Sequence, residues 1–173
     1  MAYSAGNGHG LCGRKLSGML AAAALLAGMT FAPLAAADWF VGAKAGPMMV
    51  DVPGISDPTN AGVMIGTEWG VVVGDVGVQA ELTDTIDDGS IGGSAVSANT
   101  QALYGVVRTA GPIYFIAKAG VLREEVTVGS ASESDTGSSV GLGIGFSIGL
   151  AQFELEYTQI EEDVDFLSLG VRF

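Results

Sequence analysis

Cysteine and histidine are almost absent from this sequence of 173 residues, since each occurs once, as Cys12 and His9. Both lie near the amino terminus, in a segment that we expect to be removed. The remaining chain then has no disulfide partner, no Cys/His zinc site and no histidine general base. These absences exclude most catalytic constellations. We therefore predict no catalytic residues, no cofactor and no metal centre.

Positive charge is also scarce. All nineteen acidic residues follow Ala37, where only five basic residues oppose them. The five are Lys44, Arg108, Lys118, Arg123 and Arg172. Such an acidic surface repels the phosphate backbone of nucleic acids, so we expect no nucleic acid partner.

A long apolar run occurs only near the amino terminus. Basic residues at positions 14 and 15 precede an apolar stretch that ends at about Phe31, and three alanines come just before Asp38. This order is typical of a secretory signal peptide, so we expect residues 1–37 to direct export by the Sec route and to be cleaved. No later run approaches the roughly 20 apolar residues that a membrane helix needs. Residues 38–173 have the length of a single domain.

The remaining chain is rich in glycine and in segments where large apolar residues alternate with small or polar ones. Between Val140 and Leu150, large apolar residues alternate with glycine or serine. A period of two is the pattern of a β-strand whose two faces meet different surroundings. Of the eight segments with this pattern, Thr100–Val107 can be read in either register. The other seven are Trp39–Gly46, Gly62–Gly70, Val76–Thr83, Phe115–Leu122, Val140–Leu150, Phe153–Thr158 and Phe166–Phe173.

The links between these segments alternate in length. Short links lie near Val71–Gly74, Thr109–Pro112 and Gly149–Ala151, and the long polar links are Pro47–Asn60, Asp84–Ser97, Glu124–Ser139 and Ile160–Asp165. This layout predicts an all-β fold, an eight-stranded antiparallel up-and-down transmembrane β-barrel. A soluble lipocalin-like barrel also has eight strands, but it would place its polar residues outside, the reverse of this pattern.

Aromatic residues support the membrane interpretation, because membrane barrels carry aromatic girdles at the lipid interfaces. Those near predicted strand ends on the short-turn side are Trp39, Trp69, Tyr104, Phe115 and Phe173. The alternative is that they are ordinary core residues.

Three segments resemble a known family. The opening Trp39–Gly46, the turn Arg108–Phe115 and the closing Leu167-x-Leu169-x-Val171-x-Phe173 are similar to small outer-membrane β-barrel proteins of the OmpA-like, OmpX-like and opacity-protein type. The resemblance implies a place in the bacterial outer membrane. It also implies that Leu167, Leu169, Val171 and Phe173 form the signal read by the barrel-assembly machinery. We expect a monomer surrounded by outer-membrane lipid and lipopolysaccharide.

Charged residues recur on the predicted inner faces of the strands. They are Lys44, Glu68, Glu81, Lys118, Glu154, Glu156 and Arg172. An eight-stranded barrel is only wide enough inside for side chains, and an unpaired charge there costs several kcal/mol, so these ions must pair. The first interpretation is a salt-bridge plug. The second is a gate, in which Lys44 or Lys118 changes partner and opens a narrow aqueous path through space left by inward glycines.

A ligand carrier is a third class, and it would need an apolar cavity. The predicted inward-facing residues Phe40, Met64, Leu103, Ile116 and Phe166 are the only indication of one.

Acidic residues cluster in the predicted long loops. Asp84, Asp87 and Asp88 could contact calcium or magnesium, which prefer oxygen ligands and could bridge the rim to lipopolysaccharide phosphates. The spacing in Thr85–Ser90 is not that of a calcium-binding loop, and the alternative is a set of solvated loops that repel one another.

A carboxylate enzyme is the remaining catalytic possibility. Glu154 and Glu156 lie two apart on one strand face, side by side and not across a substrate cleft. We therefore expect a non-enzymatic outer-membrane protein with a mostly plugged interior and acidic loops that serves envelope integrity or surface interaction. The alternative is a narrow channel for ions or small solutes.

Overall fold

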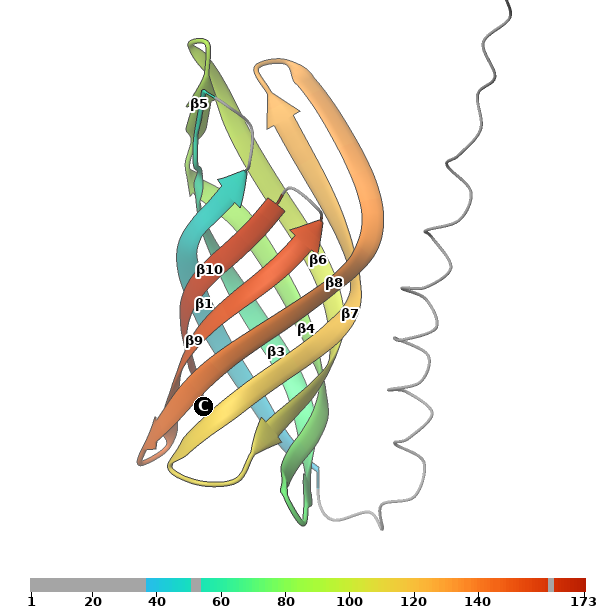
Figure 1. Cartoon of the computed structure of the whole chain (residues 1–173), viewed down its shortest axis with the longest axis vertical. Helices are drawn as coiled ribbons and strands as arrows, with labels where there is room; N and C mark the ends of the chain where they lie inside the picture. The colour runs from blue at the N-terminus through green and yellow to red at the C-terminus, as the bar shows by residue number, and fades with distance from the viewer. Residues whose placement is uncertain (1–36, 51–53, 162–163) are drawn as a thin grey trace, which may run out of the picture.

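The computed structural model describes residues 37–50, 54–161 and 164–173. Its strands are β1 (Asp38–Val50), β2 (Ile55–Ser56), β3 (Thr59–Val71), β4 (Gly74–Asp87), β5 (Gly89–Ile91), β6 (Ser94–Thr109), β7 (Ile113–Val128), β8 (Ala131–Ile148), β9 (Ala151–Glu161) and β10 (Val164–Arg172). The long strands follow one another round the wall in chain order, each antiparallel to the next, and β10 returns to pair with β1 (Figure 1). The predicted closed eight-stranded antiparallel barrel is confirmed.

Tight turns close the wall at one end, as the sequence predicts. Val72-Val73 joins β3 to β4, residues 110–112 join β6 to β7, and Gly149-Leu150 joins β8 to β9. Gly149 has a φ of 62°, which the primed two-residue turns of β-hairpins need and which glycine adopts without strain. We call this end the short-turn end and the opposite one the loop end.

The loop end differs from the prediction. Glu124–Ser139 is not a loop, because β7 continues to Val128 and β8 begins at Ala131, with only Gly129 and Ser130 between them. The boundary was wrong because a β-ladder needs no apolar face once its strands leave the barrel wall. β4 and β6 also continue into their predicted link, where the short β5 pairs with β6, and β2 from the preceding link pairs with β5.

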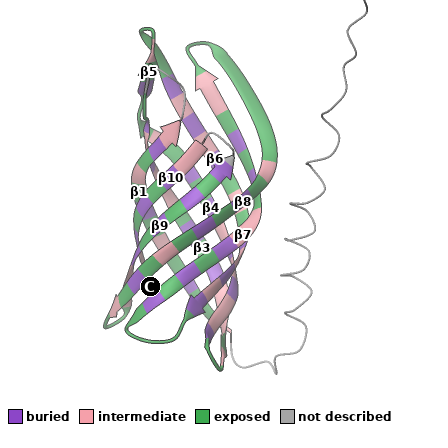
Figure 2. Ribbon diagram, in the orientation of Figure 1, coloured by how far each residue is buried: buried purple, intermediate pink, exposed green. Residues whose placement is uncertain are grey.

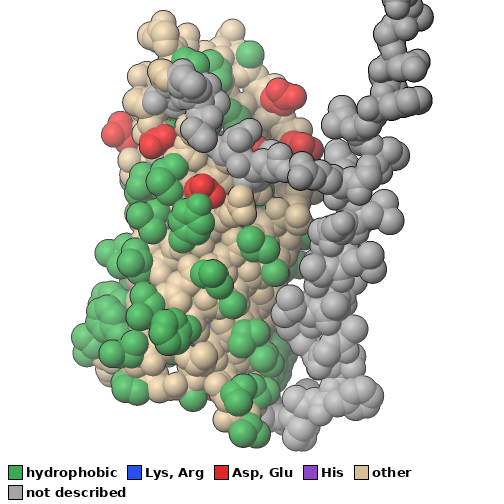
Figure 3. Space-filling model, viewed as in Figure 1, with side chains coloured by type: hydrophobic (Ala, Val, Ile, Leu, Met, Phe, Trp, Pro, Cys, Tyr) green, Lys and Arg blue, Asp and Glu red, His purple; other side chains and the backbone are tan. Residues whose placement is uncertain are grey.

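The outer surface of the wall is apolar. Exposed side chains along the strands include those of Val41, Val63, Ile65, Leu82, Val121, Leu142, Ile144, Leu155 and Leu169. Buried and exposed residues alternate along each strand (Figure 2), and hydrophobic side chains cover the body of the molecule while acidic ones gather towards the loop end (Figure 3). Among the described residues, no helix is long and apolar enough to cross a membrane.

The register of β6, which the sequence left open, is decided by its neighbours. Leu103 was expected inside, but its side chain is 51% exposed on the outer face. Tyr104 was expected in the outer girdle, but it is 1% exposed and lies inside. Both faces of this segment carry apolar residues, so only pairing with β4 and β7 could settle which face turns inward.

The interior is built in three layers, and β1 crosses all of them. From the short-turn end to the loop end, its inward side chains are Phe40, Lys44 and Met48, and all three are buried. Phe40 accompanies a layer of arginine and glutamate, Lys44 belongs to a layer of lysine and glutamate, and Met48 belongs to an apolar layer. Side chains therefore occupy the lumen, apart from a hollow of about 220 Å³ at the short-turn end that is bordered by Phe40, Glu68 and Arg172.

Candidate functional site

The first layer, nearest the short-turn end, joins two arginines to two glutamates. Arg108 pairs with Glu68 through Nη1 and with Glu154 through Nε, the latter at 3.0 Å. Arg172 pairs with the same carboxylates, with Nη1 2.8 Å from Glu68 and Nε 3.0 Å from Glu154. The Tyr114 hydroxyl donates to Glu154 at 2.9 Å. Each charge in this layer has two partners of opposite sign.

The second layer joins two lysines to two glutamates. Lys118 Nζ lies 2.6 Å from Glu81 Oε1 and 2.6 Å from Glu156 Oε2. Lys44 Nζ donates to Glu81 Oε2 and lies 3.6 Å from Glu156 Oε2. All four side chains are at most 4% exposed. The glutamates thus hold both ammonium groups inside the barrel.

Gln79 on β4 connects the two layers. Its amide oxygen accepts from Arg108 Nη2 at 2.8 Å, and its amide nitrogen donates to Glu81 Oε1 at 2.6 Å. Aromatic rings surround the same cations, with the Lys118 ammonium 4.6 Å from the centre of the Tyr104 ring. The ions therefore form one continuous network, whose strength comes from shared partners in a site of low dielectric constant.

The network contains four cations and four carboxylates, so its formal charges balance. All seven residues proposed from the sequence lie in it, and the structure adds Arg108, which is 2% exposed. Sequence reasoning had assigned Arg108 to a turn. The signal that could have found it is charge balance, because the predicted set held three cations against four carboxylates and a dry interior requires neutrality.

A third layer covers the network at the loop end. Its buried members are Met48, Ala98, Leu122, Ile160 and Phe166, with Ala102, Val126 and Val164 packed against them. Water that enters from the loop end meets this apolar layer before it reaches the two salt-bridge layers. Ion passage would require both the apolar layer and the salt-bridge layers to rearrange.

Inward glycines do not leave open space. A side chain at Gly145 would overlap the Tyr114 ring, and one at Gly66 would overlap the Phe40 ring. These glycines make room for aromatic side chains of the neighbouring strands. At these two positions the space beside the glycine is therefore occupied by an aromatic ring.

Gly145→Ala should destabilise the barrel by about 1–3 kcal/mol, because the added methyl group displaces Tyr114 from Glu154 in a filled interior. The measurement is urea unfolding of the protein in lipid vesicles. Gly70→Ala is the control, because the nearest neighbouring atom would lie 3.8 Å from the new carbon. Gly149→Ala is not suitable, because the positive φ at that position would strain an alanine. Equal stability of both variants would contradict a packed lumen.

The two glutamates that we considered above as a possible catalytic pair are not free to act as an acid or a base. Glu154 and Glu156 are buried and bind arginine and lysine, respectively. Asp84 points outward from β4, Asp87 ends that strand and Asp88 follows it. Among the described residues, no three acidic, histidine or cysteine side chains converge to hold a metal ion.

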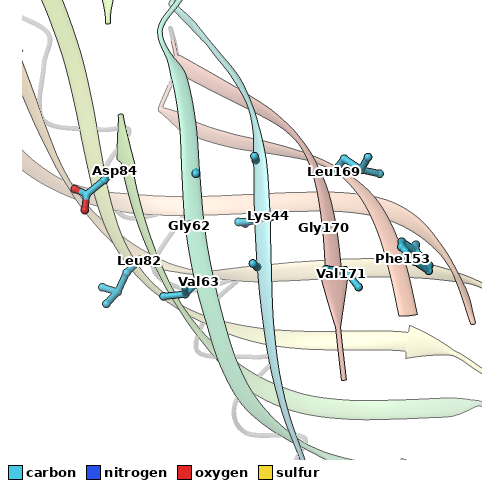
Figure 4. Close-up of a pocket in the computed structure, with 12 residues that line it drawn as sticks. Lys44, Gly62, Val63, Leu82, Asp84, Phe153, Leu169, Gly170 and Val171 are labelled. Atoms are coloured by element: carbon cyan, nitrogen blue, oxygen red, sulfur yellow. The ribbon is translucent and has the colours of Figure 1, made fainter. Parts of the chain in front are cut away.

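One pocket lies on the outer wall. It is a shallow groove of about 730 Å³ over β1, β3 and β10, bordered by Val63 and Leu82 on one side and by Leu169 and Val171 on the other (Figure 4). The apolar residues expected to line an inner cavity are elsewhere: Phe166 is in the third layer and Ile116 packs with Tyr104.

The last strand contributes to the apolar outer wall. Leu167 and Leu169 are exposed there, as is Phe173 just beyond β10. Val171 of the same face is half-buried. Trp39 and Phe115 are also exposed near strand ends on the short-turn side.

Comparison with known proteins gives solved structures only, since no family model and no curated protein matches. The chain resembles Neisserial surface protein A, with a TM-score of 0.53 and 13% identity over 80% of this chain and 98% of that one. The amino-terminal barrel domain of Pseudomonas aeruginosa OprF gives a TM-score of 0.53 and 17% identity, over 78% and 96%. The attachment invasion locus protein Ail of Yersinia pestis gives 0.54 and 14%, over 79% and 97%.

The fold is that of a small outer-membrane β-barrel. Because these identities are low, the likeness concerns architecture and not any residue of the site. Within that architecture, this barrel has a neutral ionic network under an apolar layer.

Proposed function

We propose that the protein is a non-enzymatic barrel of the bacterial outer membrane whose lumen is closed and whose acidic loop end faces outward, where it serves envelope integrity or surface interaction. The observation that carries the proposal is the filled lumen, two ion-paired layers beneath the apolar layer around Met48 and Phe166. A transport protein needs a path for its substrate through the lumen. A closed barrel can interact with other molecules only through its two ends and its outer wall.

The apolar wall supports the membrane location. A soluble barrel would expose side chains such as Leu142, Ile144 and Leu169 to water at a large cost, while in lipid these contacts are favourable. The proposal includes export by the segment 1–37, which lies outside the described residues except for Ala37. It also includes recognition of Leu167, Leu169, Val171 and Phe173 by the barrel-assembly machinery.

The acidic residues at the loop end favour partners that carry positive charge. A structure of Ail holds the heparin analogue sucrose octasulfate, a polyanion. Here the exposed residues Asp87, Asp88, Glu125, Glu133 and Asp135 would repel a polyanion. The charge favours cationic partners, or lipopolysaccharide phosphates bridged by a divalent cation near Asp84, Asp87 and Asp88.

Conductance in a planar bilayer tests the closed lumen. We expect the refolded wild-type barrel to be silent, once a gel shift on heating confirms that the barrel has closed. Arg123→Glu, a charge reversal on the exposed face of β7, serves as the control and should also be silent. Discrete openings in the wild type would contradict the closed-lumen proposal.

A gated narrow channel is the second candidate, and the position of Lys44 favours it. The ammonium donates to Glu81 yet lies only 3.6 Å from Glu156 Oε2, and Glu156 Oε1 has no hydrogen-bond partner among the described residues. A switch of partner would need little movement. If wild type opens and Glu81→Lys alters the openings, the network is a gate.

A further inference from the structure

One strand leaves the barrel wall with an open edge. β8 pairs with β7 from Ala131 to Phe146, but β9 joins its other side only from Val140 onwards. Within the described residues, Ala131–Ser138 therefore has a strand neighbour on one side only. Residues 131–136 and 138 are all exposed, so no other part of the described chain covers them. Figure 1 shows this hairpin rising at the loop end.

The hydrogen-bonding groups on that edge can be assigned from the ladder. The two-residue turn makes Val128 and Ala131 a hydrogen-bonded pair, so the odd-numbered residues of β8 bond to β7. The N–H and C=O groups of Ser132, Ser134, Thr136 and Ser138 then point to the open side. The Thr136 N–H donates to its neighbour Asp135 Oδ1 at 2.7 Å, which is the local substitute for a missing strand.

Natural proteins usually protect such edges with charged side chains, lysine above all, or with proline, bulges or very short strands. Residues Ala131–Ser138 contain no proline and no lysine, and their pairing with β7 is regular throughout. The charges present are Glu133 and Asp135, on the side of the sheet that continues the barrel interior. Across the hairpin, Arg123 is the only basic residue against four acidic ones.

We propose that the open edge of β8, Ala131–Ser138, is a docking site for an extended, basic segment of a partner protein, which adds to the sheet as a further strand. Backbone pairing supplies affinity, and lysine or arginine at alternate positions faces Glu133 and Asp135. A second copy of this chain is disfavoured because it would place acidic strands side by side. This inference rests on the proposed outward-facing loop end and names the class of partner.

The test uses the folded full chain in detergent and a labelled peptide of alternating threonine and lysine, eight residues long. We expect wild type and Ser134→Thr to bind it. Ser134→Pro should bind roughly tenfold more weakly, because proline removes an edge donor without removing a bond to β7. The same peptide N-methylated at alternate residues keeps its charge but loses one row of donors, and it should bind weakly to wild type.

Equal binding of the two peptides, or equal binding by Ser134→Pro and wild type, would overturn strand addition. Dimerisation sensitive to Ser134→Pro without peptide would replace the basic partner by a second copy. If Ser134→Pro fails to fold, hydrogen exchange decides, because the peptide should slow exchange of the Ser132, Ser134 and Ser138 amides of wild type. An epitope at Ser130 that antibody cannot reach on intact cells would overturn the proposed orientation and leave the binding result standing.

Discussion

Replacing Arg108 by methionine should lower the free energy of unfolding of the barrel by about 3–5 kcal/mol. The guanidinium pairs with Glu68 and Glu154 and donates to Gln79. Its removal leaves the buried carboxylate of Glu154 and the partly exposed carboxylate of Glu68 with Arg172 as the cation that they share. Methionine fills much of the volume, so the loss reports on charge and not on a cavity. Urea unfolding in lipid vesicles measures it.

Arg123→Met is the matched control, because Arg123 is an exposed arginine on the next strand, β7. We expect its effect to stay within about 0.5 kcal/mol, as for other surface substitutions. The proposed role of the network in stability would be lost if the two variants unfolded at the same urea concentration. A larger loss in Arg108→Met than in the control would support the ionic network as the structural element that fills the lumen.

Ile144→Arg should destabilise the barrel by about 2–4 kcal/mol if the apolar wall is embedded in lipid. Ile144 lies at the middle of Val140–Ile148, the part of β8 that belongs to the wall, and it is 42% exposed on the outer face. An arginine there would have to carry its charge into the hydrocarbon region. The measurement is again unfolding from vesicles, where the surrounding lipid is part of the folded state.

Leu150→Arg provides the comparison for this position. Leu150 is 90% exposed in the turn between β8 and β9, where the chain reaches the interface. Its replacement should cost at most about 1 kcal/mol, because a charge near the interface stays hydrated. Two equal and small losses would mean that the apolar wall does not lie in a bilayer.

Much of the site could be predicted from the alternation of inward- and outward-facing residues along each strand. Once Lys44 and Lys118 are placed opposite outward-facing apolar residues on their strands, the pleat sends both ammonium groups into the lumen. The same reasoning placed Glu81, Glu154 and Glu156 there. It could not say which carboxylate meets which cation, because those contacts link residues as far apart as Glu68 and Arg172 and depend on the stagger of the closed wall.

The sequence by itself determined the eight strands of the barrel wall and their outward apolar face, because alternation and turn chemistry are local properties of the chain. Tertiary structure decided the register of β6, which brings Tyr104 and Arg108 inside and turns Leu103 outward. It also decided that Gly145 accommodates Tyr114, and that β7 and β8 continue beyond the wall to leave an open edge. These outcomes depend on neighbouring strands that are distant in sequence, and the residue pattern of one strand does not specify which strands flank it or in which register.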